Sequence, residues 1–225
     1  MRPISACCLL WLCAAASADG ATVTFSSQGP FSIHDGPAFF VYEIQVANIV
    51  ESVTEINVTF SDLFHVHPAD IDALLVGPGG QNVMLMSDVG ELLSDADSII
   101  DNVNLVFRDG AAALPGNVRV TSGIYAPTNY QGVIEDIPEM DRSAPAMPPP
   151  GPYGSSLAVF NGVNGTWKLY IQDDLEDEGG ELAAWSITVT TVPEPTGAVL
   201  IMAGAVALLL LRSRMLPVAN GKATI

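Results

Sequence analysis

Histidine and aspartate residues gather in one short stretch of this sequence, which contains His65, His67, Asp70 and Asp72. On an extended strand, residues two apart share a face, so His65 and His67 could bind a metal ion such as zinc together. Pro68 ends any such strand, because proline has no backbone N–H for a sheet. We therefore predict a structural role for His67, hydrogen-bonded near Asp70.

Nucleophilic catalysis has little support in the sequence. A serine nucleophile needs a base such as histidine, and the sequence has only one histidine, His34, besides His65 and His67. No Gly-x-Ser-x-Gly motif is present. The cysteines Cys7, Cys8 and Cys13 all precede the region expected to fold, which excludes a disulfide, a thiolate metal site and a cysteine nucleophile there. We predict a protein that is not an enzyme; a hydrolase using His67 with nearby aspartates is an alternative.

A second group of possible metal ligands is the acidic segment 173–180, Asp-Asp-Leu-Glu-Asp-Glu-Gly-Gly. Calcium is bound by several carboxylate and carbonyl oxygens on irregular loops, and a cation would relieve the repulsion between these carboxylates. The segment is not an EF-hand, because Trp185 stands where that loop requires a bidentate glutamate. A bound calcium ion and a merely solvated acidic turn both remain open.

The charge of the chain restricts its partners. The formal net charge is −17, and all 25 acidic residues lie between Asp19 and Pro195. The basic residues of that region are Arg108, Arg119, Arg142 and Lys168. Such a region repels nucleic acid and anionic lipid, so no nucleic-acid partner is expected. Cations, basic proteins and neutral or cationic sugars remain plausible partners.

Strands position these residues. Apolar and polar residues alternate with a period of two in four runs, which is typical of strands with one buried face. The apolar positions of these runs are Tyr42, Ile44 and Val46; Ile56, Val58 and Phe60; Trp167, Leu169 and Ile171; and Trp185, Ile187 and Val189. Glycine and proline turns separate the runs, and the proline-rich residues 135–154 are expected to form an extended loop over the fold. We predict one all-β domain, 19–191, built as an antiparallel β-sandwich.

Two motifs resemble the P domain that accompanies proprotein convertases and many bacterial subtilisin-like proteases. The first is residues 67–80, His-Pro-Ala-Asp-Ile-Asp-Ala-Leu-Leu-Val-Gly-Pro-Gly-Gly; the second comprises residues 164–174 with 179–180 and 184–189. The resemblance implies a jelly-roll-like β-sandwich, closed by a pair of strands around the acidic turn. In this family the turn is sometimes a calcium site. That role would fall to Asp173, Asp174, Asp177, Asp70 and Asp72.

Trp167 and Trp185 lie on this closing pair of strands. Each is in phase with the apolar side of its strand, so we expect both side chains in the core, on paired strands that would allow a cross-strand or a same-face contact between them. The protease that usually precedes a P domain has no counterpart among the motifs of this chain.

Both ends of the sequence resemble targeting signals. Residues 1–18 have the charged, apolar and small-residue order of a secretory signal peptide. Residues 192–225 resemble a PEP-CTERM sorting tail: Pro193-Glu194-Pro195, an uncharged run from 196 to 211 expected to be a transmembrane helix, and then Arg212 and Arg214. The resemblance implies an exosortase partner, an inner-membrane-tethered precursor and a final place in the cell envelope, at the cell surface or in the extracellular matrix. A permanent tail anchor is the alternative.

The sequence thus predicts a non-catalytic, exported surface or matrix protein that serves adhesion or contacts with extracellular polysaccharide or envelope proteins. The alternative function is an accessory domain that acts in trans with a subtilisin-like protease.

Overall fold

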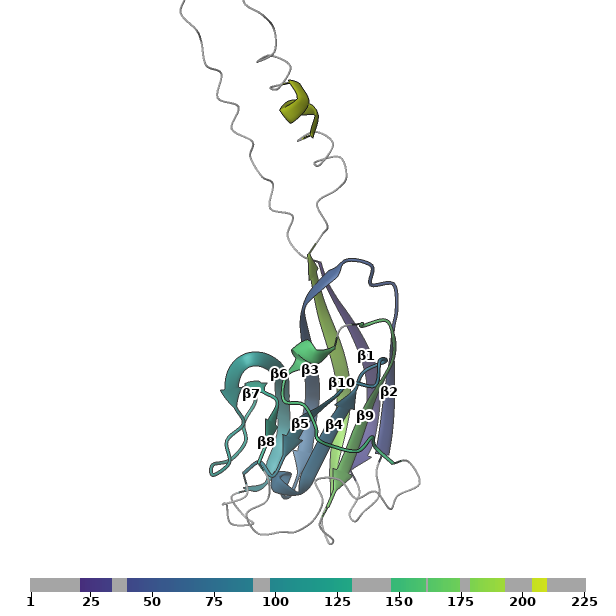
Figure 1. Cartoon of the computed structure of the whole chain (residues 1–225). Coiled ribbons are helices and arrows are strands. Elements are labelled where there is room, and N and C mark those ends of the chain that lie inside the picture. The colour runs from purple at the N-terminus through teal and green to yellow at the C-terminus, as the bar shows by residue number, and fades with distance from the viewer. Residues whose placement is uncertain are drawn as a thin grey trace, which may run out of the picture.

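Two five-stranded sheets packed face to face form the sandwich (Figure 1). The computed structural model describes residues 21–33, 40–90, 98–130, 147–160, 162–174, 179–192 and 204–209. The strands are β1 (Thr22–Ile33), β2 (Phe40–Val46), β3 (Ser52–His65), β4 (Ile71–Val76), β5 (Asn82–Ser87), β6 (Ile100–Ala113), β7 (Gly123–Ala126), β8 (Thr128–Asn129), β9 (Gly165–Asp173) and β10 (Gly180–Val192). The predicted all-β sandwich is confirmed.

The first sheet has the order β1-β10-β3-β6-β7. β10 is antiparallel to β1 and to β3, and its pairing with β3 runs from Val192 opposite Ser52 to Gly180 opposite His65. β6 is antiparallel to β3, but the registered pairs extend only from His65 to Val58. Beyond Phe107, β6 leaves β3 and its last residues pair with β7. The chain enters this sheet at the start of β1 and leaves it at the end of β10, at the same end of the sandwich (Figure 1).

The second sheet has the order β2-β9-β4-β5-β8. β9 lies between β2 and β4 and is antiparallel to both, with Ile71 opposite Asp173 and Asp72 opposite Gln172. The outer face of the second sheet carries a small apolar cluster of Leu74, Met84 and Tyr170. Because the first motif forms β4 and the second forms β9 and β10, the two motifs contribute central strands of both sheets.

The core lies between the two inner faces, as the alternation predicts. Phe60 and Phe107 meet edge to face with ring centroids 5.1 Å apart, and both are fully buried. Trp167 and Trp185 are also fully buried. The expectation that these tryptophans occupy paired strands is wrong, because β9 and β10 belong to different sheets. The motif containing them therefore spans the sandwich instead of forming a hairpin within one sheet.

The described part of the proline-rich segment, residues 147–154, is irregular and lies against the second sheet. Met84 donates its backbone N–H to the carbonyl of Gly154 at 3.0 Å, and Tyr153 packs on the outer apolar cluster. The expected loop over the sandwich is therefore confirmed for these residues; 135–146 lie outside the described residues.

The two targeting signals lie almost entirely outside the described residues, which include only a short helix, 204–209, from the tail. No helix in the described part of the chain combines the length and apolar character that crossing a membrane requires.

Replacing each tryptophan by phenylalanine is expected to have unequal costs. Trp167 donates its indole N–H to the carbonyl of Val163 at 2.7 Å, whereas the buried indole N–H of Trp185 has no hydrogen-bond partner in the described structure. Trp167→Phe leaves a buried carbonyl without its donor, and Trp185→Phe breaks no such bond. Urea denaturation should give Trp167→Phe a loss of unfolding free energy about 1–2 kcal/mol greater than that of Trp185→Phe. Equal losses would contradict this account.

Candidate functional site

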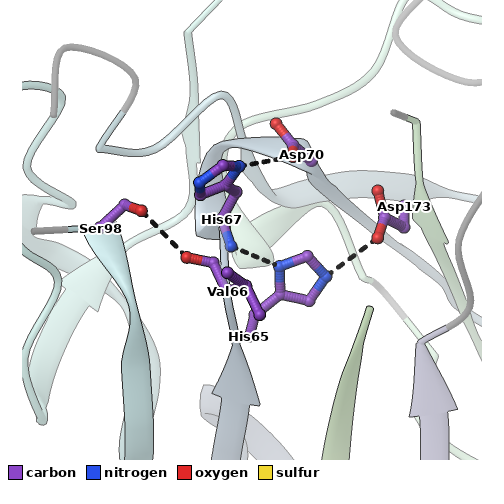
Figure 2. Close-up of polar contacts among 6 residues, drawn as sticks. All are labelled: His65, Val66, His67, Asp70, Ser98 and Asp173. Carbon is purple, nitrogen blue, oxygen red and sulfur yellow. Dashed lines mark hydrogen bonds and ion pairs between the residues drawn. The ribbon is translucent and has the colours of Figure 1, made fainter. Parts of the chain in front are cut away.

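A buried histidine–aspartate pair links the two sheets at the end of the sandwich opposite the chain ends. His65 is the last residue of β3, and Asp173 is the last residue of β9. His65 Nε2 lies 3.2 Å from Asp173 Oδ2, and both side chains are fully buried (Figure 2). The pair is thus inside the protein, where neither group is exposed to a substrate.

A β-bulge in β3 turns His65 toward the interior. Ile56, Val58 and Phe60 face inward with a period of two, which would place His65 on the outer face. The register with β6 shifts between Phe60 and Leu63, where Asp62 has a left-handed backbone with φ of 52°. The shift reverses the alternation, so Leu63 and His65 point inward.

The neighbouring backbone fixes the tautomer of His65. The N–H of His67 donates to His65 Nδ1 at 3.1 Å, so this nitrogen carries no proton, and the proton of the neutral ring is on Nε2, facing Asp173 (Figure 2). Gly180 lies directly opposite His65 on β10, and a Cβ at Gly180 would collide with the imidazole ring and with the carbonyl of Phe64. Both ring nitrogens are thus engaged within the protein.

His67 contacts Asp70 across the short 3-10 helix η1 (Pro68–Asp70), with 3.6 Å between His67 Nδ1 and Asp70 Oδ2 (Figure 2). This contact is consistent with the predicted structural role of His67. Backbone bonds also hold the turn, because Asp70 N–H donates to the carbonyl of His67 at 3.1 Å and Asp174 N–H donates to the carbonyl of Asp70 at 3.0 Å. Ser98 donates its hydroxyl to the carbonyl of Val66 at 2.9 Å (Figure 2).

The five aspartates proposed for calcium do not all converge. Directly opposed residues of paired strands share a face, and successive residues alternate. With Ile71 opposite Asp173 and Asp72 opposite Gln172, Asp173 points into the sandwich and Asp72 points to the outer face. Asp177 lies outside the described residues, and no group of three or more possible ligands that could hold a metal ion occurs within them. Calcium binding stays a prediction for the acidic turn.

An acidic cleft of about 900 Å³, which the sequence did not indicate, lies at the end of the sandwich where the chain enters and leaves. Residues 51–56 of the β3 region form one wall, and the opposite wall includes Asp109 of β6 and the 3-10 helix η2 (Leu157–Val159). Asp109 accepts hydrogen bonds from the hydroxyl of Ser156 at 2.8 Å and from the N–H groups of Leu157 at 2.9 Å and Ala158 at 3.0 Å. This carboxylate fixes η2 to β6.

A second clamp closes one end of the cleft. Asn164 accepts a hydrogen bond from the N–H of Ile49 at 3.0 Å and donates its side-chain amide to the carbonyl of Ile49 at 2.6 Å. The residues that clamp the cleft come from segments far apart in the sequence, so the alternation of apolar residues could not reveal them. The Asn164-Gly165 turn of the second motif was the available signal.

Comparisons with known proteins give neighbours in structure only. No model of a known protein family matches the chain, and no curated protein matches it. The chain is similar to a serine protease of Aeromonas sobria solved in complex with its chaperone, ORF2, with 14% identity and a TM-score of 0.40 over 77% of this chain and 28% of that chain. It is also similar to a structure of the Aeromonas sobria serine protease, with 14% identity and a TM-score of 0.38 over 76% of this chain and 27% of that chain.

The buried pair is expected to behave as one energetic unit. Asp173→Ala leaves the buried imidazole of His65 without the carboxylate that it faces at 3.2 Å and should cost about 3 kcal/mol of unfolding free energy. In a His65→Ala background the same change should cost at least about 1 kcal/mol less, because its partner is already gone. Chemical denaturation of the four proteins measures the coupling. Additive losses would contradict the pairing, and a His67→Ala background serves as the control that should leave the cost of Asp173→Ala unchanged.

The calcium hypothesis predicts different effects for substitutions of Asp174 and Asp72. If the acidic turn binds calcium, a hundredfold excess over Kd should stabilise the fold by about 2.7 kcal/mol. Asp174→Asn should remove this stabilisation, whereas Asp72→Asn, on the other face of the sheet, should retain it. The measurement is the melting temperature with calcium and with a chelator. An unchanged melting temperature in the unmodified protein would remove the hypothesis.

Proposed function

We propose that this chain is a non-catalytic, exported β-sandwich protein of the cell surface or extracellular matrix that works by binding other molecules. The observation that supports this proposal most directly is the state of His65, which is fully buried with one ring nitrogen bonded to the backbone and the other facing Asp173. A general base must reach a proton of its substrate. His65 is engaged in joining the sheets, His67 contacts Asp70 in the turn that follows β3, and His34 lies outside the described residues.

The P-domain resemblance, with its jelly-roll-like arrangement, is part of this proposal. Its motifs provide β4, β9 and β10, and the residue types that define it have structural tasks in these positions. Trp167 and Trp185 fill the core from opposite sheets, and Gly180 gives His65 its space. These observations agree with a motif that is retained for folding.

Export and sorting complete the proposal. The sandwich begins with β1 at Thr22 and ends with β10 at Val192, close to the proposed end of the signal peptide at residue 18 and directly before Pro193 of the sorting motif. A signal peptidase and an exosortase would thus cut next to the folded domain without disrupting it. The acidic domain would then be released to the envelope, the cell surface or the matrix.

An accessory domain that acts in trans with a subtilisin-like protease is the second candidate function. The P-domain motifs favour it, because such domains usually accompany these proteases. The two candidates share a non-catalytic sandwich and differ in the partner.

Recovery of the protein from the envelope and medium of the organism that produces it tests both candidates. We expect an intact mass that begins near Asp19 and ends between Pro193 and Thr196, because both signals are removed. A mass that includes Ile225 would contradict the sorting proposal and indicate a retained tail. Proteins recovered with it under native conditions decide the partner: a bound subtilisin-like protease supports the second candidate, and envelope proteins or polysaccharide support the first.

A further inference from the structure

The cleft contains an open strand edge. β3 is paired with β10 along its whole length, but its registered pairs with β6 begin only at Val58. β6 diverges after Phe107, where its register shifts and Gly110 takes a positive φ of 78°. The edge of residues 52–57 that faces away from β10 therefore has no strand partner in the described structure. In an antiparallel strand, about half of the backbone N–H and C=O groups point to each edge.

Space and rigidity make this edge accessible to a ligand. The cleft of about 900 Å³ runs along residues 51–56, within the range of volumes found for binding pockets. Its walls are held by the Asp109 bonds to η2 and by the Asn164 clamp on Ile49. A partner that binds there meets a surface that is already ordered, which lowers the entropic cost of binding.

The charges of the cleft select the partner. Among the described residues, Glu51, Glu55 and Asp109 line it, and no lysine, arginine or histidine does. Arg108 Nε lies 4.0 Å from Glu55 Oε1, but both side chains are nearly half exposed, so this ion pair is weak and easily exchanged. The cleft also includes apolar surface, mainly from the partly buried Val53, with small contributions from the almost fully buried Leu157 and Phe160.

Other ligand classes fit less well. Sugars stack on exposed aromatic faces. Phe160, the one aromatic residue that lines the cleft among the described residues, is buried and packs its ring on Trp167 at 4.6 Å between centroids. A metal ion is disfavoured because the Asp109 carboxylate is already bonded to η2 and no metal-ligating group of three occurs in the described residues. An extended peptide can satisfy the open edge, the apolar surface and the negative charge together.

We propose that the cleft binds an extended basic peptide segment of a partner protein, which adds as a strand along residues 52–57 of β3. Its backbone pairs with the open edge, its lysine or arginine side chains meet Glu51 and Glu55, and its intervening apolar side chains contact the floor of the cleft. This inference rests on the proposed function of a binding module and names the chemistry of its partner.

Binding of a labelled peptide of alternating lysine and valine, measured by fluorescence anisotropy on the purified full-length chain, tests the inference. A peptide of about eight residues is long enough to span the edge. We expect saturable binding that weakens as salt is added, and no binding of a glutamate–valine peptide or of a neutral oligosaccharide. Hydrogen exchange of the amides in residues 52–57 should slow when the lysine–valine peptide is bound.

Two variant pairs locate the site. Glu51→Gln with Glu55→Gln should weaken binding about tenfold, whereas Glu181→Gln, an exposed carboxylate outside the cleft, should not. Gly162→Trp should fill the cleft and weaken binding at least tenfold, because a Cβ there meets open space, and Gly162→Ala should leave it unchanged.

The inference is overturned if the lysine–valine peptide does not bind, if Glu181→Gln weakens binding as much as the cleft variants, or if no amide of residues 52–57 exchanges more slowly when the peptide is added. Stronger binding of the oligosaccharide would also overturn it. The assay uses purified protein, so its result does not depend on export. The intact mass can therefore contradict the sorting proposal while the cleft still binds the peptide. Equally, the mass can agree with sorting while the peptide does not bind.

Discussion

The pairing of β3 with β10 is the constraint on which the rest of the structure depends. These two strands share a register from Ser52 to His65 and carry the centre of the first sheet. The buried His65–Asp173 contact and the open edge of β3 lie at opposite ends of this strand pair. At one end His65 reaches across the core to Asp173 of the second sheet; at the other end β6 departs and leaves the edge of β3 open.

In the described structure no strand of one sheet pairs with a strand of the other. Polar links at the two ends of the sandwich therefore come from side chains. At the His65 end, the buried imidazole of His65 faces the buried carboxylate of Asp173, and the backbone N–H of His67 donates to the other ring nitrogen. At the cleft end, Asn164 binds both backbone groups of Ile49. A buried polar group is costly unless it is paired, so such links are specific as well as stabilising. They hold each end in one geometry that apolar packing alone would leave adjustable.

The sequence was sufficient to predict the strands and the core, but not which strands pair with each other. A period of two tells which face of a strand is buried, and it placed Phe60, Trp167 and Trp185 correctly in the core. It carries no information about which sheet a strand joins, so Trp167 and Trp185 were assigned to paired strands although they come from opposite sheets. The bulge at Asp62 was also not predicted, because a period of two assumes an unbroken alternation along the strand. Leu63 follows Phe60 after three positions instead of two, and this break in the alternation was the one local sign that His65 would turn inward.

The same break in strand pairing that opens the cleft would endanger a neutral protein. An exposed strand edge can pair with the same edge of another copy and begin aggregation. In this chain, Glu51 and Glu55 line the cleft beside the open edge, and the whole chain has a formal net charge of −17. Two copies that approach edge to edge would bring like charges together, which costs free energy, whereas a basic strand would gain from the same charges. The acidity of the protein thus has a specific structural consequence: it protects the open edge of β3 from its own copies and leaves that edge available to partners of opposite charge.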